Sequence, residues 1–116
     1  QRTAAEVAAI RQRAEQGNAA AQSLLGFVYS AGDGVPQDFV EAHKWVNLAA
    51  SRATGDDQKK AAEFCDFMAE QMAPAQLAEA QRFATEWQAA FDARQKLRGA
   101  DDDPTHPRRN LRFGVK

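Results

Sequence analysis

A helix–turn–helix pattern over residues 24–55 constrains the fold of this chain more than any other feature. Apolar side chains recur at steps of three and four residues on both sides of a central turn, which is the spacing of one face of an α-helix. Before the turn they are Ala21, Leu24, Leu25 and Val28, and after it they are Phe39, Ala42, Val46, Ala49 and Ala53. The pattern predicts two helices joined as a hairpin.

The turn is marked by the residues between the two apolar stripes. Gly32 and Gly34 can adopt the left-handed backbone that ends a helix, and Pro36 cannot continue the first helix. Asp38 is a favourable N-cap for the second helix, and Glu41 three residues later completes a capping-box pattern. The local residues therefore predict both the end of one helix and the start of the next.

The hairpin pattern recurs after 38 residues. Residues 36–45 and 74–83 share the pattern Pro-x-x-apolar-x-Glu-Ala-x-basic-aromatic, which pairs Trp45 with Phe83 and Ala42 with Ala80. A period of this length is typical of helical hairpins that stack side by side. We therefore predict an all-α fold, a short α-solenoid of stacked antiparallel helix hairpins with about five helices.

The same residues resemble the Sel-one-like repeat, a relative of the tetratricopeptide repeat. Three elements carry the resemblance, in order: Leu-Gly-x-x-Tyr at 25–29, Gly-x-Gly-Val at 32–35 and Trp-x-x-x-Ala-Ala at 45–50. Residues 4–17 resemble the second helix of a preceding repeat, and residues 56–91 resemble the terminal repeat that often closes bacterial members. The repeat and the resemblance together assign structural roles to Leu25, Gly26, Gly32, Gly34, Ala42, Trp45, Ala49, Pro74, Ala80 and Phe83.

Helix start and stop signals divide the rest of the chain. Thr3 and Glu6 form a capping box for a first helix that ends near residue 16, and Gly26 in mid-helix predicts a close approach to another helix. A fourth helix is expected from the break at residues 54–57 to about Met72. Pro74 opens a fifth helix, whose stripe of Leu77, Ala80, Ala84, Trp87 and Phe91 is expected to be buried and which extends to about Leu97.

The composition changes after this helix, which places a domain over residues 1–98 and a polar tail over residues 99–116. The tail carries an acidic block, a basic block and two prolines, and it shows no helical period. It is interpreted as a solvated extension, with the alternative that Leu111 and Phe113 anchor it to the body or to a neighbouring chain.

Composition limits the classes of partner. With 44% apolar and 27% charged residues the chain is typical of a globular protein, and its net charge of −1 gives no electrostatic case for nucleic acid or an anionic membrane. No apolar run approaches the ~20 residues that span a bilayer. The chain begins at Gln1 without a methionine, which is consistent with a removed export signal, so the periplasm or secretion is favoured over the cytoplasm.

No combination of residues predicts catalysis, a cofactor or a metal site. His43 is interpreted as a solvated or capping helix residue, and His106 lies in the tail. One cysteine and two histidines provide no zinc-ligand spacing, and residues 101–103 are interpreted as a solvated acidic run. Cys65 shares a helix face with apolar residues and is expected to be a buried structural thiol.

The resemblance implies a non-enzymatic protein–protein interaction module, an adaptor or scaffold that binds a protein partner not identified by the sequence. The first helix of each hairpin would line a concave binding surface, and the candidate contacts are Gln22, Ser23 and Tyr29. The first helix lacks a hairpin mate, so its stripe of Val7 and Ile10 is expected to be exposed and to favour a homodimer.

Two other functions remain open at this point. Some cysteine-rich relatives in the wider family are linked to β-lactam binding, which suggests a small-molecule-binding or hydrolytic module, although the paired cysteines are missing here. The unpaired first helix also suits the terminal cap of a longer repeat protein.

Overall fold

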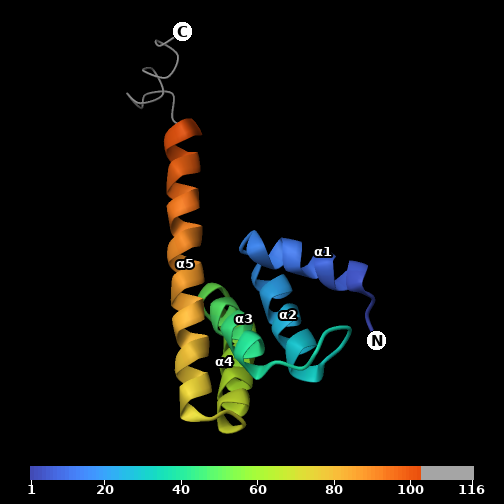
Figure 1. The fold of residues 1–116 in the computed structure, drawn as a ribbon. Coiled ribbons are helices and arrows are strands. Elements are labelled where there is room, and N and C mark those ends of the chain that lie inside the picture. The colour runs from blue at the N-terminus through green and yellow to red at the C-terminus, as the bar shows by residue number, and fades with distance from the viewer. Residues whose placement is uncertain (103–116) are drawn as a thin grey trace. The chain divides into compact units, whose positions relative to one another are not determined.

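The structure is a computed structural model that describes residues 1–102 and the side chains of residues 1–99. The described residues form helices and no strand, which confirms the predicted all-α fold (Figure 1). The helices are α1 (Ala4–Glu15), α2 (Ala19–Ala31), α3 (Phe39–Arg52), α4 (Gly55–Glu70) and α5 (Pro74–Asp102). The chain forms two compact units, residues 1–85 and residues 86–116.

Helices that follow one another in sequence pack together in the first unit. α1 packs on α2, α2 on α3 and α3 on α4, and the directions of α2, α3 and α4 alternate (Figure 1). The core between α3, α4 and the start of α5 is formed by Ala42, Val46, Ala61, Met68, Met72 and Ala80. Burial of these apolar side chains supplies the main driving force for packing, about 25 cal/mol for each Å² removed from water.

Side-chain caps begin the first three helices, and those at Thr3 and Asp38 were predicted. Thr3 Oγ1 accepts from the Glu6 N–H at 3.1 Å while Glu6 Oε1 accepts from the Thr3 N–H at 2.7 Å, a complete capping box. Asn18 Oδ1 accepts from the Ala21 N–H at 2.8 Å. These bonds satisfy backbone donors that the first turn of a helix cannot pair internally.

The expected capping box at α3 is only half formed. Asp38 Oδ1 accepts from the Glu41 N–H at 3.1 Å, as predicted. The Asp38 N–H instead donates to the Tyr29 carbonyl oxygen at 3.0 Å, and the Glu41 carboxylate pairs with Lys44 Nζ at 3.3 Å. The backbone bond from Asp38 to Tyr29 thereby connects the start of α3 to α2.

Glycines at two predicted positions permit the hairpin geometry. A Cβ atom at Gly26 would overlap Val46 Cγ2 and lie 3.0 Å from the Ala42 carbonyl oxygen, so the predicted close approach of α2 and α3 is confirmed. Gly32 has a φ of 67°, which is the left-handed conformation predicted for the end of α2. Leu25, Ala42 and Trp45 are fully buried, as the repeat pattern predicted.

Three expectations about exposure are wrong. His43 was expected to be solvated, but only 6% of it is exposed, because α3 is covered by both α2 and α4. Val7 and Ile10 were expected to form an open stripe, but α1 packs on α2 and buries both. The stripe of α5 is buried only at Ala80 and Ala84 and half-buried at the three larger residues Leu77, Trp87 and Phe91.

Two helix ends also differ from the prediction. α4 ends at Glu70, before Met72, and α5 continues past Leu97 to Asp102, into the first residues assigned to the tail. In the described part of the second unit, the rings of Trp87 and Phe91 stack with centroids 5.0 Å apart. His106 and the suggested anchors Leu111 and Phe113 lie outside the described residues. None of the described helices is both long enough and apolar enough to cross a bilayer.

Candidate interaction groove

A groove of about 730 Å³ lies between α2, the C-terminal end of α3 and the first half of α4. We call it the α2–α4 groove. Its wall from α2 consists of Ala19, Ala20, Ser23, Leu24 and Phe27, and the other residues that line it are Ala49, Arg52, Ala53, Thr54, Asp57, Lys60, Ala61 and Phe64. All of these residues belong to the first compact unit.

Side chains from α2 and α4 face each other across the groove at two heights along the helices, which we call levels. Ser23 and Phe27 are four residues apart on α2, and Lys60 and Phe64 are four residues apart on α4, so each pair shares one helix face. α2 and α4 run in the same direction (Figure 1), and the rings of Phe27 and Phe64 lie 6.5 Å apart between centroids. An aromatic level therefore lies about one helical turn, ~5.4 Å, from a polar level.

The aromatic level continues beyond the groove as a cluster of three rings. Phe67 stacks on Phe64 with centroids 6.4 Å apart and an interplanar angle of 17°. Phe27 is 49% exposed and Phe67 is 55% exposed, whereas Phe64 is half-buried against the core. We call Phe27, Phe64 and Phe67 the phenylalanine cluster. Contact between exposed aromatic rings concentrates apolar surface at one place, which is a feature of interaction sites.

Hydroxyl and charged side chains line the other end of the groove, near the N-terminal ends of α2 and α4. Arg52, Thr54 and Asp57 join Ser23 and Lys60 there, where the chain passes from α3 into α4. Thr54 is the N-cap residue of α4, but its side chain makes no capping hydrogen bond. The Arg52 guanidinium donates to the Leu48 carbonyl oxygen at 3.4 Å, a long bond that a helix C-terminus commonly provides.

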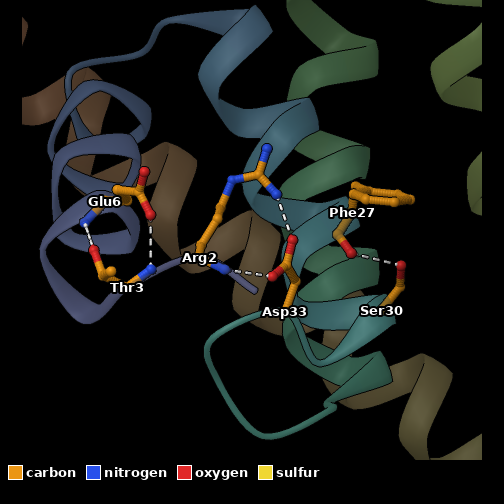
Figure 2. A network of polar contacts seen from close by, with 6 residues as sticks. All are labelled: Arg2, Thr3, Glu6, Phe27, Ser30 and Asp33. Carbon is orange, nitrogen blue, oxygen red and sulfur yellow. Dashed lines mark hydrogen bonds and ion pairs between the residues drawn. The ribbon is translucent and has the colours of Figure 1, made fainter.

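The opposite end of α2 is fixed by contacts to the start of the chain (Figure 2). The Arg2 N–H donates to Asp33 Oδ1 at 2.7 Å, and the Arg2 guanidinium pairs with Asp33 Oδ2. The backbone hydrogen bond and the Arg2 charge lower the pKa of the Asp33 carboxyl group, although partial burial opposes them. A Cβ atom at Gly34 would overlap the Arg2 carbonyl oxygen, so the turn and the N-terminal residues are closely packed.

Of the three partner contacts predicted from the sequence, only Ser23 lines the groove. Gln22 is fully buried, and its Nε2 donates to the Ala14 carbonyl oxygen at 3.0 Å, so it joins α1 to α2 and is not a surface contact. Tyr29 is half-buried, and its hydroxyl accepts from Arg11, whose guanidinium carbon lies 5.6 Å from the ring centroid. Tyr29 therefore contributes to the α1–α2 contact.

Sequence reasoning missed the phenylalanine cluster. Phe27 and Phe67 fall outside the buried stripes of their helices, which contain Leu25 and Val28 on α2 and Ala61 and Met68 on α4. An apolar residue at an off-stripe position is the available signal. This signal becomes informative only when such residues are brought together, and here Phe27 and Phe67 both contact Phe64, which depends on the tertiary structure.

Burial shifts the pKa values of Cys65 and His43, the two side chains that could act as a nucleophile or a base. Burial raises the pKa of the Cys65 thiol to about 11, and the nearby Asp66 charge adds to this effect, so the sulfur remains a thiol at neutral pH. Burial lowers the pKa of His43, and the Asp66 charge opposes this shift only in part. Within residues 1–99, no group of three or more histidine, cysteine, aspartate or glutamate side chains is arranged to hold a metal ion.

The sequence matches no protein-family model, and no curated protein and no solved structure is detectably similar to it.

Proposed function

We propose that this chain is a small Sel-one-like repeat α-solenoid that binds a protein partner through the α2–α4 groove. The phenylalanine cluster is the observation that carries the proposal. Phe27 lines the groove and Phe67 stacks on the groove residue Phe64, and each exposes about half of its surface. Exposed aromatic side chains of this kind supply much of the binding energy of protein interfaces.

Support for the repeat type comes from the elements that carry the sequence resemblance. Gly26 lies at the close contact of α2 with α3, Gly32 ends α2 in the left-handed conformation, and Trp45 is fully buried. Each of these residues therefore has a structural reason to be where the repeat pattern requires it. The groove between α2 and α4, the first helices of successive hairpins, is where a solenoid presents its concave surface.

The role proposed for the groove requires no chemistry of its own. Apolar side chains from Leu24, Phe27 and Phe64 would exclude water from a partner side chain, and the hydroxyl and charged groups of the polar level would set its orientation. Binding through a few residues of a preformed groove also limits the conformational entropy that the protein loses.

Selection from a random peptide display library tests the proposal without assuming a partner. The expected result is enrichment of peptides that bind the native chain and lose at least tenfold in affinity for Phe27→Asp, since a carboxylate would then replace an exposed ring of the groove. Leu97→Asp is the control, because Leu97 is also an exposed apolar residue, 58% accessible, and does not line the groove.

Two results would contradict the proposal. One is the absence of any enriched peptide from repeated selections with folded protein. The other is a set of binders that tolerate Phe27→Asp and Leu97→Asp equally well, which would place the binding surface elsewhere. Circular dichroism of both variants must show the native helix content, which is expected because neither side chain is buried.

A further inference from the structure

We infer that the partner segment of the α2–α4 groove carries a carboxylate and a large apolar side chain spaced about one helical turn apart. The inference rests on the proposed function and specifies the chemistry of the partner. It follows from the two levels of the groove, the aromatic level of Phe27 and Phe64 and the polar level of Ser23 and Lys60.

The charge of the polar level favours an anion. Arg52 and Lys60 place two cationic groups along the groove, and Asp57 is the single carboxylate among the lining residues. Within the described residues no ion pair involves Lys60, whose side chain is exposed. A carboxylate from the partner would supply that pair, whereas a basic group would meet two like charges.

Hydroxyl groups beside these cations suit the same ligand group. Ser23 lines the α2 wall, and the Thr54 hydroxyl is not used to cap α4. Both hydroxyls can donate to a carboxylate oxygen, which accepts several hydrogen bonds at once. Cationic and hydroxyl donors along this end of the groove therefore form a consistent environment for an acidic side chain.

The aromatic level sets the second requirement. Phe27 and Phe64 provide the apolar contacts of this level, and Phe67 extends them. A partner side chain such as phenylalanine or leucine would bury its surface there. The separation of ~5.4 Å between the levels matches residues three or four apart on a helical segment. A wholly apolar segment would instead cover the Lys60 ammonium group without pairing it, which is unfavourable.

Titration of isotope-labelled protein with short end-blocked peptides, followed by NMR, tests this inference. The probe peptide carries one phenylalanine and one glutamate four residues apart on an alanine and serine background. Matched peptides replace the glutamate by glutamine or by lysine, or the phenylalanine by alanine. The acidic aromatic peptide is expected to bind best, with a loss of about fivefold when glutamate becomes lysine.

Lys60→Glu and Lys59→Glu form a matched pair of variants. Both lysines are exposed on the same turn of α4, but only Lys60 lines the groove. Lys60→Glu is expected to reverse the preference, so that the lysine peptide binds better than the glutamate peptide. Lys59→Glu changes the net charge by the same amount and is expected to retain the original preference.

Failure of this inference is distinguishable from failure of the proposed function. Library-selected peptides that require Phe27 but bind equally well with or without their carboxylates would overturn the inference and leave the groove as a binding site. An equal effect of Lys60→Glu and Lys59→Glu would also overturn it, because a general charge effect would then explain the preference. Absence of binding by the acidic aromatic peptide at several millimolar would also overturn the inference.

Discussion

Gly26 of α2 lies against Val46 of α3, so closely that a Cβ atom at Gly26 would overlap Val46 Cγ2. The Ala42 carbonyl oxygen would lie 3.0 Å from the same atom, so backbone as well as side chain borders the site. Val46 is fully buried in the core that α3 forms with α4 and α5. The contact therefore sets how closely α2 can approach the rest of the first unit, and with it the position of the α2 wall of the groove.

Gly26→Ala is expected to lower the free energy of unfolding by about 1–3 kcal/mol, the usual cost of overpacking a core. The higher helix propensity of alanine, worth up to about 1 kcal/mol, offsets part of the loss. Urea unfolding measures the change. Val46→Ala removes the nearest obstacle and should make Gly26→Ala less damaging in the double variant than in the native background.

Gly99→Ala is the matched control for this prediction. Gly99 lies in α5, and a Cβ atom there would meet nothing within 4 Å. The substitution is therefore expected to be neutral or stabilising. A similar loss at Gly26 and Gly99 would mean that the close contact of α2 with α3 does not limit the first unit.

Trp45→Ala is expected to destabilise the protein by about 3–5 kcal/mol, because it removes a fully buried large aromatic side chain. Since small domains have a total stability of about 5–15 kcal/mol, the variant could be largely unfolded at 37 °C. Thermal unfolding followed by circular dichroism checks the prediction. A melting temperature within a degree or two of the native value would contradict the core position of Trp45.

Features of the fold that depend on neighbouring residues were predicted from the sequence more fully than features that depend on long-range contacts. The caps at Thr3 and Asp38 depend on bonds between residues three apart, so they could be predicted from neighbouring residues. The close approach at Gly26 was also predicted, because a glycine in mid-helix requires a compensating contact.

Burial of polar side chains could not be predicted in the same way. His43 and Gln22 lie beside the apolar stripes of α3 and α2, and each of these helices is covered by two neighbours, so more than one face is buried. A single stripe in the sequence indicates only one covered face. The groove was missed for the related reason that its two aromatic rings, Phe27 and Phe64, come from helices that are not adjacent in sequence, and Phe27 lies outside the buried stripe of α2.

Ala73→Thr is expected to stabilise the protein by about 0.5–2 kcal/mol, the range for an improved N-cap. Pro74 is the first residue of α5, and the Ala73 N–H already donates to Gln76 Oε1 at 2.9 Å, which is one half of a capping box. A threonine hydroxyl would add the other half by accepting from the Gln76 N–H.

Ala75→Thr is the control for the cap. Ala75 is exposed in the first turn of α5 but is not the N-cap, so threonine there should bring a small loss from its lower helix propensity. Denaturant midpoints compare the two variants. A midpoint for Ala73→Thr that is unchanged or lowered would show that its hydroxyl does not complete the cap.

His43 is expected to make the protein less stable in mild acid. Burial lowers the pKa of His43 below its usual 6.5, so the unfolded chain binds a proton more readily than the folded chain. The free energy of unfolding should therefore fall as the pH drops below about 6.5, until the lower pKa of the folded state is reached. In His43→Gln this part of the pH dependence should disappear, whatever the effect of the substitution on stability at neutral pH.

Asp33 affects the free energy of unfolding in a separate and lower pH range than His43. The hydrogen bond from the Arg2 N–H lowers the pKa of the Asp33 carboxyl group below 3.8, so its contribution is present above that pH and is lost as the pH falls through the folded-state pKa. Unfolding curves from pH 8 to pH 3 for the native chain and His43→Gln separate the two effects. A parallel loss of stability between pH 6.5 and pH 5 in both proteins would contradict the role of His43.

NMR contacts between a bound peptide and the phenylalanine cluster test the binding role of the α2–α4 groove most directly. The measurement is a filtered nuclear Overhauser experiment on the native protein with a library-selected peptide. The account predicts contacts from peptide side-chain protons to the rings of Phe27 and Phe64. Contacts confined to residues outside the groove, such as the exposed face of α1, would contradict it.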